Sequence, residues 1–319
     1  MTKEADFVTL QFTKRMPETY FWHIARAERA IKTVLAGSAF ARFTKKRLPC
    51  ENIVKKHDDT VYANDHKQSQ IDKLESLGAV GCATNIEIAE KSDIIITMIP
   101  TSKHVMDCYD ELLPYLCEGK ICIDMSTIDP DVSIAVSEKV KAKGAQFADC
   151  PVVRSKADAI AGTLGVLAGC DEELFAVIEP ILSYMGQKVI YMGKNGMGLT
   201  AKICHNTLVA QIQNAVNETL LLAQKYGVSI DNFADAVAAG GAQNFYMQAQ
   251  RDKLKNEDWT TAFSLENVCK DINICAKMSE AIGFDMPGMR VAKAAIEKGV
   301  KRGWGKQDFR QTYRIVRGD

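Results

Sequence analysis

Short runs of consecutive apolar residues alternate with amphipathic stretches between about residues 60 and 190 of this chain. Continuous rather than alternating hydrophobicity indicates strands covered on both faces, as in a parallel sheet with helices on each side. Helical patterns at 71–77 and 131–143 lie between such runs. The apolar runs occupy residues 92–100, 119–127, 145–153, 163–170 and 188–193. This alternation predicts an α/β fold with a Rossmann-like, doubly wound parallel sheet.

The pattern changes after Gly193, where strand signals almost vanish. Residues 198–226 read as one long helix, apolar on most sides and followed by Gly227 in a C-cap position. Further helical patterns occupy residues 230–239, 264–282 and 287–301. We therefore expect a Rossmann-like domain over residues 1–193, and an all-α C-terminal domain over 194–319 that includes the long linking helix.

Composition and charge narrow the class of protein. The 319 residues are 47% hydrophobic, and Lys+Arg and Asp+Glu both number 40. Zero net charge argues against a nucleic-acid or membrane-surface partner, because both usually require a basic excess. No apolar run approaches a membrane span, and the first residues lack the layout of a signal peptide. The ten cysteines form no CxxC pair or zinc-like cluster, so we expect a cytoplasmic protein with no disulfide framework and no structural metal.

Polar and glycine-rich turns follow several predicted strands. Ser126 and Thr127 follow one strand, Asp149 and Pro151 another, and the glycine-rich segment 193–198 opens the long helix. Ligands of open α/β sheets bind at the carboxyl ends of the strands. A site is therefore expected where these turns meet.

Four polar residues recur along one stripe of the long helix at intervals of four, seven and four: Lys202, Asn206, Gln213 and Asn217. A lysine on a buried helix is costly unless it is paired or lines a cavity. The alternative is that Lys202 extends to solvent near the helix start. The glycine turns beside it favour a functional role.

The segment from Gly196 to Asn206 has the pattern G-x-G-x-x-x-K-x-x-x-N, which resembles the catalytic motif of the β-hydroxyacid dehydrogenases. Three further segments are similar to motifs of that family and occur in the same order. They are Asp124-Met125-Ser126-Thr127 with Pro130, Asp149-Cys150-Pro151-Val152 followed by Gly162-Thr163-Leu164, and Lys270-Asp271. The resemblance extends from about residue 50 to the C-terminus.

The resemblance implies hydride transfer between NAD or NADP and a small β-hydroxy acid or its semialdehyde or keto form, with Lys202 as general acid or base and Asn206 beside it. A lysine pKa lowered by desolvation suits this role. The resemblance further implies the remaining site residues and a homodimer or homotetramer. It assigns substrate binding to Ser126, Thr127, Gly162 and Thr163, and cofactor binding to Met98, Pro100 and Lys270. His205 lies about 100° round the helix from Asn206 and is interpreted as structural.

The sequence departs from the family where P-V usually continues with S-G-G. Val153, Arg154 and Ser155 stand there instead. Arg154 either grips a carboxylate or phosphate, or points into solvent. We expect a substrate larger or more acidic than 3-hydroxyisobutyrate.

A second departure lies at the N-terminus. The place expected for a G-x-G-x-x-G loop, residues 41–46, has no glycine, the nearest being Gly37. The first 49 residues hold ten Lys and Arg against four Asp and Glu and show no clear first strand. Three explanations stay open: a frameshifted or misassembled segment, a real replacement that leaves a cofactor-free relative, or altered cofactor binding.

The cofactor preference depends on the end of the predicted strand at residues 60–63. Asp65 there is a candidate for bonding the ribose hydroxyls of NAD, whereas Lys67 suits a 2′-phosphate, so NAD is slightly favoured. The alternatives to a hydroxyacid dehydrogenase are a non-catalytic relative and an imine reductase. Imine reducers often lack the helix lysine, so Lys202 favours hydroxy acids.

Overall fold

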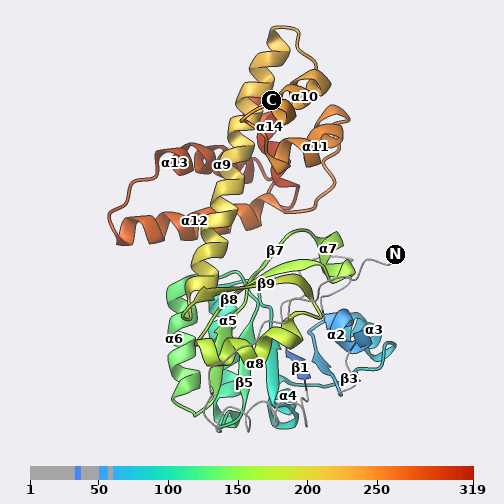
Figure 1. The fold of residues 1–319 in the computed structure, drawn as a ribbon, viewed down its shortest axis with the longest axis vertical. Coiled ribbons are helices and arrows are strands. Elements are labelled where there is room, and N and C mark those ends of the chain that lie inside the picture. The colour runs from blue at the N-terminus through green and yellow to red at the C-terminus, as the bar shows by residue number, and fades with distance from the viewer. Residues whose placement is uncertain (1–32, 37–49, 57–59) are drawn as a thin grey trace, which may run out of the picture.

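The computed structural model describes residues 33–36, 50–56 and 60–319, which form a sheet domain and a helical domain joined by one long helix (Figure 1). The strands are β1 (Thr33–Ala36), β2 (Tyr62–Asn64), β3 (Val80–Gly81), β4 (Ile94–Thr97), β5 (Ile121–Asp124), β6 (Gln146–Asp149), β7 (Val152–Val153), β8 (Leu164–Gly169) and β9 (Gly186–Gly193). The helices among them are α2 (Cys50–Lys56), α3 (Gln68–Glu75), α4 (Asn85–Lys91), α5 (Ser102–Leu112), α6 (Pro130–Lys141), α7 (Lys156–Ala161) and α8 (Glu172–Leu182). The helices that follow are α9 (Met197–Lys225), α10 (Ile230–Ala239), α11 (Phe245–Lys255), α12 (Leu265–Ala281), α13 (Pro287–Lys301) and α14 (Thr312–Arg317).

The sheet has the strand order β3-β2-β1-β4-β5-β6-β8-β7, with β9 paired to β8. Neighbours from β3 through β6 are parallel, and β1 lies between β2 and β4. The expectation of no clear first strand is therefore wrong. A run of only four residues, Thr33–Ala36, in a basic segment gave too short a hydrophobic signal. The place expected for the glycine loop, 41–46, lies outside the described residues.

The predicted fold class is confirmed, but the far edge of the sheet differs in direction. β8 runs antiparallel to both β6 and β7, and β9 runs parallel to β8. Continuous hydrophobicity reports that both faces of a strand are covered, and it does not report the direction of the strand.

Alternate residues of the central strands face two separate cores, which explains their continuous hydrophobicity. Ile94 and Ile96 of β4 belong to a core that also takes residues from α3 and α8. Ile95, between them, faces a core with residues from α4, α5 and α6. Helices thus cover both faces of the sheet, as the pattern predicts.

Helix α9 rises from the sheet and runs through the helical domain (Figure 1). This 29-residue helix contributes several of its residues to a third core, together with residues of α12 and α13. Gly227 follows its C-terminus with φ +90°, a left-handed conformation that favours glycine. Within the described part of the chain, no helix is long and apolar enough to cross a membrane.

Candidate active site

Asp149, at the end of β6, fixes the start of α9 to the sheet. One carboxylate oxygen accepts the backbone N–H of Gly196 at 2.6 Å, and the other accepts that of Leu199 at 2.7 Å. Burial raises the pKa of Asp149 to about 7, while these two N–H groups act in the opposite direction. Gly198 has to be small, because a Cβ there would lie 2.4 Å from the carbonyl oxygen of Leu167. The helix is therefore anchored one turn before Lys202.

Lys202 lies on the first turns of α9 with only 9% of its surface exposed. Its ammonium makes no hydrogen bond or ion pair with any residue that the structure describes. Burial lowers the pKa of Lys202 to about 8; the charge of Asp271 opposes this and that of Lys270 adds to it. The structure does not support the alternative of a lysine that extends to solvent. A lysine with this pKa can donate or accept a proton near neutral pH.

A polar network from α9, α12 and the turn after β5 lies around Lys202. Asn206 Nδ2 donates to Asp271 Oδ2 at 2.7 Å, and Asp271 Oδ1 lies 3.0 Å from the ammonium of Lys270. That ammonium also donates to the carbonyl oxygen of Thr127. The structure thus brings together four residues from three motifs that lie far apart in the sequence: Lys202 and Asn206, Thr127, and Lys270.

Asp271 is the residue whose importance the sequence did not reveal. It is 2% exposed and contacts both Asn206 and Lys270, and its charge acts on Lys202. The available signal was its place in the Lys270-Asp271 pair, where only the lysine received a role. An acidic residue next to a lysine on a helix otherwise looks like an ordinary surface pair.

His205, interpreted as structural from its place on the helix, contacts Asn206 of this network. Its Nδ1 lies 3.1 Å from Oδ1 of Asn206. The 100° step between neighbouring helix residues separates their Cβ atoms, but an imidazole is long enough to bend toward the next side chain. Burial and the charge of Lys202 lower the pKa of His205.

Ser126 joins two turns at the carboxyl ends of β4 and β5. Its hydroxyl donates to Asp124 Oδ1 at 2.5 Å and accepts the backbone N–H of Ile99 at 2.6 Å. Burial raises the pKa of Asp124 to about 6. Ile99 lies between Met98 and Pro100, so this contact holds both predicted cofactor residues beside Ser126 and Thr127. Ser126 is 1% exposed, and its hydroxyl bonds Asp124 and the backbone of Ile99, so its contact with a substrate stays a prediction.

Arg154, Gly162 and Thr163 form a separate group around α7, and no described bond joins them to Lys202 or Asn206. The Arg154 guanidinium donates to the carbonyl oxygen of Thr163 at 3.1 Å and lies 3.6 Å from Asp158. Arg154 has φ +83°, at a position where the related pattern has glycine. A left-handed conformation costs a residue with a side chain about 1–2 kcal/mol. Arg154 therefore holds a strained position, and its side chain is about half exposed.

Asp65 follows β2, where a Rossmann-like sheet presents an acidic residue to ribose. Its Oδ1 accepts the backbone N–H of Lys67 at 2.8 Å, and its Oδ2 is buried with no hydrogen-bond partner among the residues that the structure describes. Burial raises the pKa of Asp65. An unpartnered acceptor at this place fits a ligand hydroxyl. Among the described residues, no group of His, Cys, Asp or Glu is arranged to hold a metal ion.

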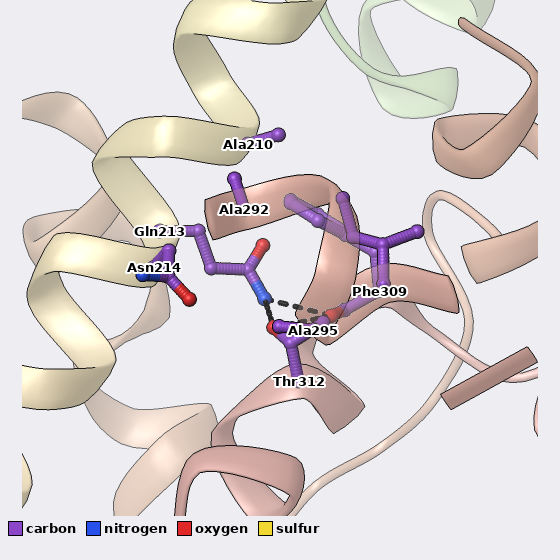
Figure 2. Close-up of a pocket in the computed structure, with 8 residues that line it drawn as sticks. Ala210, Gln213, Asn214, Ala292, Ala295, Phe309 and Thr312 are labelled. Carbon is purple, nitrogen blue, oxygen red and sulfur yellow. Dashed lines mark hydrogen bonds between the residues drawn. The ribbon is translucent and has the colours of Figure 1, made fainter. Parts of the chain in front are cut away.

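Two recesses lie along the middle of α9, and neither includes Lys202 or Asn206. Figure 2 shows the first, where the Gln213 amide from α9 points toward the segment that begins α14. Its Nε2 donates to the carbonyl oxygen of Phe309 at 2.7 Å and to the hydroxyl of Thr312. Both recesses are thus distinct from the candidate site, which we define by its polar network.

Two family models match the chain on either side of the start of α9. Residues 50–193 match the family model described as the NAD binding domain of 6-phosphogluconate dehydrogenase. Residues 196–316 match the model described as NAD-binding of NADP-dependent 3-hydroxyisobutyrate dehydrogenase. The boundary between the two matches falls between β9 and α9, just before the helix that carries Lys202.

Two curated relatives and one solved structure extend the comparison. Glyoxylate/succinic semialdehyde reductase 1 of Arabidopsis thaliana is 30% identical over 252 residues, 78% of this chain and 87% of the relative. The 2-(hydroxymethyl)glutarate dehydrogenase of Eubacterium barkeri is 26% identical, over 80% of this chain and 86% of the relative. A structure of Mycobacterium tuberculosis 3-hydroxyisobutyrate dehydrogenase with L-serine has a TM-score of 0.81 and 24% identity, and covers 90% of this chain and 99% of that one.

Proposed function

The chain belongs to the β-hydroxyacid dehydrogenase family of NAD(P)-dependent oxidoreductases, and we propose that Lys202 moves the proton that accompanies hydride transfer. A bound nicotinamide supplies or accepts the hydride. In reduction, the ammonium of Lys202 gives its proton to the carbonyl oxygen of a semialdehyde or keto acid. In oxidation, the neutral amine takes the proton of the hydroxyl group. Proton and hydride together convert C=O to CH–OH.

The proposal rests chiefly on the surroundings of Lys202. A buried ammonium without a hydrogen bond is costly, and this one has a pKa lowered to about 8. Asp271 is the one described carboxylate whose charge acts on it. This arrangement leaves the proton of Lys202 free for a ligand, which a merely structural lysine in an ion pair would not do.

We extend the proposal to NAD as the favoured cofactor, with Asp65 beside the ribose hydroxyls and Met98, Pro100 and Lys270 toward the nicotinamide end. The unpartnered Oδ2 of Asp65 supports this choice, because a 2′-phosphate there would meet a carboxylate. Fluorescence titration with NADH and NADPH tests it. We expect tighter binding of NADH, and an Asp65→Asn variant that discriminates less. Equal affinity for both cofactors in the unaltered chain would count against Asp65 as the selector.

The substrate we propose is a hydroxy acid larger or more acidic than 3-hydroxyisobutyrate, bound through Ser126, Thr127, Gly162 and Thr163. The relatives named for succinic semialdehyde and 2-(hydroxymethyl)glutarate support a second carboxylate. The described contacts of the Arg154 guanidinium, with Thr163 and Asp158, both involve Nη1, and the N–H groups of Nε and Nη2 are available to a second carboxylate. An Arg154→Gly variant should lose activity on diacids more than on monocarboxylates. An equal change on both would separate Arg154 from selectivity.

Turnover of a panel containing glyoxylate, succinic semialdehyde, 3-hydroxyisobutyrate and 2-(hydroxymethyl)glutarate tests the activity directly. Lys202→Ala should lose turnover with every substrate that the unaltered chain accepts. Near-normal turnover of Lys202→Ala would remove the lysine mechanism. A cyclic imine in the same panel separates a C=N reducer from a hydroxyacid dehydrogenase, because the lysine is not required by the former.

We also propose a homodimer or homotetramer. A groove of about 440 Å³ between α9 and α13 is lined in part by Ile212 and Val291, and Val291 is more than half exposed. Light scattering of the purified chain measures the subunit number, and a monomer at all concentrations would contradict this part of the proposal.

A further inference from the structure

His205 is a neighbour of Lys202 as well as of Asn206. Residues three and four positions apart lie side by side on a helix surface, so Lys202, His205 and Asn206 share one face of α9. Lys202 and Asn206 are buried, whereas His205 is exposed. The imidazole therefore lies at the solvent-exposed rim of the buried pair, and no motif of the sequence assigned it a role.

The hydrogen-bond partners of Asn206 determine which of its two amide positions is Nδ2 and which is Oδ1. Asp271 Oδ2 lies 2.7 Å from one end, and a carboxylate paired with the Lys270 ammonium only accepts hydrogen bonds. That end is therefore Nδ2, and the end that faces His205 is Oδ1. Since Oδ1 also only accepts, the 3.1 Å contact requires the hydrogen to be on Nδ1 of His205. The geometry thus fixes the tautomer of the neutral imidazole.

Asn206 in turn holds the carboxylate whose charge acts on Lys202. Among the described residues, the charged groups that act on Lys202 are Asp271 and Lys270 of α12, and the group that acts on His205 is Lys202 itself. Asp271 favours the protonated form of Lys202, and Lys270 opposes it. If Asp271 loses its bond to Asn206, the opposing effects of Asp271 and Lys270 on the pKa of Lys202 change, although Lys202 itself is unaltered.

We propose that His205 is a positioning residue, whose Nδ1–H orients the Asn206 amide so that Asn206 holds Asp271 beside Lys202. His205 acts through Asn206 and needs no contact with a substrate. Its effect on turnover rests on the proposed function, whereas its tautomer and its bond to Asn206 do not. The two parts are therefore tested separately.

The first test reads the tautomer by NMR of the chain labelled with ¹⁵N-histidine at pH 8. The chain has five histidines, and a His205→Gln variant identifies the His205 resonances by their absence. We expect the Nδ1–H tautomer, although free neutral histidine prefers Nε2–H. In an Asn206→Leu variant, His205 should return to Nε2–H. An Nε2–H tautomer in the unaltered chain, or no change in the variant, would overturn the proposal.

The second test compares His205→Leu, which has no donor, with His205→Gln, whose amide can donate to Asn206. We expect His205→Leu to lower kcat about tenfold, the worth of one hydrogen bond, with KM within about twofold. The alkaline limb of the pH–rate profile of His205→Leu for reduction should move to lower pH. The reason is that Asp271, which favours protonated Lys202, is less firmly held. His205→Gln should restore kcat to within about threefold of the unaltered chain.

Thermal unfolding of both variants is the control for folding, and both should unfold near the unaltered chain because His205 is exposed. Unchanged kcat in His205→Leu, or equal losses in two folded variants, would overturn the positioning role. If the unaltered chain turns over no substrate, the proposed function fails, while the tautomer measurement still decides the role of His205.

Discussion

Two pairs of polar residues on α9 share one stripe but have different surroundings. Lys202 and Asn206 lie where the helix leaves the sheet, among the charged groups Asp271 and Lys270. Gln213 and Asn217 lie two to four turns further along and contact neutral groups. Gln213 donates to the carbonyl oxygen of Phe309 (Figure 2). The Asn217 amide lies 3.1 Å from the hydroxyl of Thr312.

The difference shows what helical spacing can and cannot determine. Spacing places all four side chains on one buried face, which is confirmed for each of them. Helical spacing does not determine which groups these four side chains contact. The downstream amides have fixed partners and attach α9 to the C-terminal segment. Lys202 has no hydrogen bond or ion pair within the described part of the chain and has a lowered pKa. The proposed catalytic residues and a structural pair thus occur on the same periodic stripe.

Replacing Lys202 with Met should produce the largest effect. Loss of the general acid and base should lower kcat by about 10²–10⁴-fold. The same variant should be more stable at pH 7, by up to about 3 kcal/mol, because burial lowers the pKa of Lys202 from 10.5 to about 8. Below pH 8 the lysine is charged in both states, so the full cost of burying the charge is present. The cost shrinks as pH rises toward 10.5.

Urea unfolding at pH 7 and pH 10, together with steady-state kinetics, measures both effects of Lys202→Met. The gain in stability at pH 10 should be smaller than at pH 7. A variant that keeps its turnover, or one that is less stable at pH 7, would place Lys202 among the structural residues of the stripe.

The pH dependence of the unaltered enzyme provides the next largest effect. In the proposed mechanism reduction uses protonated Lys202, so kcat/KM should fall above about pH 8, about tenfold per unit. Oxidation uses the neutral amine of Lys202, so kcat/KM for oxidation should rise over the same pH range. Rate profiles in both directions, at saturating cofactor, test this. Profiles with the same direction in reduction and oxidation would show that another group controls the rate.

Gln213→Met tests the downstream pair with a side chain of similar length. The carbonyl oxygen of Phe309 and the hydroxyl of Thr312 each lose one of their hydrogen-bond donors, which should cost about 1–3 kcal/mol of unfolding free energy. Its kcat should stay within about twofold of the unaltered enzyme, because Gln213 lies three helical turns from Lys202. Chemical denaturation and steady-state kinetics on the same preparation measure both effects. A large loss of kcat in a stable protein would contradict the distinction between a catalytic upstream pair and a structural downstream pair.

Much of the fold was predictable from the hydrophobic pattern, because continuous runs and 3.6-residue periodicity reflect burial directly. The runs near β4, β5 and β6 and the helices α9, α12 and α13 are examples. β1 was missed because its four residues carry little signal, and the direction of β8 was missed because burial is independent of direction. Both depend on pairing with distant segments.

The candidate site was predictable only in part for the same reason. The motif from Gly196 to Asn206 located Lys202, since its members lie close along the chain. Asp271 is 65 residues from Asn206 and Asp149 is 47 residues from Gly196, so tertiary folding alone brings each pair together. His205 needed the actual direction of a side chain. Roles for Arg154, Gly162 and Thr163 stay predictions.

Asp271→Asn should give the smallest of these effects and tests how the upstream pair differs from the downstream one. The amide keeps the shape of the carboxylate and can still accept from Asn206, so only the charge is removed. Without that charge, and with Lys270 left unpaired, the pKa of Lys202 should fall below about 8. The alkaline limb of the reduction profile should move by about one pH unit, which corresponds to about 1.4 kcal/mol.

A matched control removes the same charge from the far end of the helical domain. Asp235 on α10 is exposed and pairs with Arg251, and α10 lies at the end of α9 away from the sheet (Figure 1). Asp235→Asn should leave the limb in place, because water and salt screen an exposed charge at that distance. Equal shifts in both variants would mean that net charge controls Lys202. A shift in Asp271→Asn alone would mean that the upstream half of the stripe is functional because of the one carboxylate that Asn206 holds.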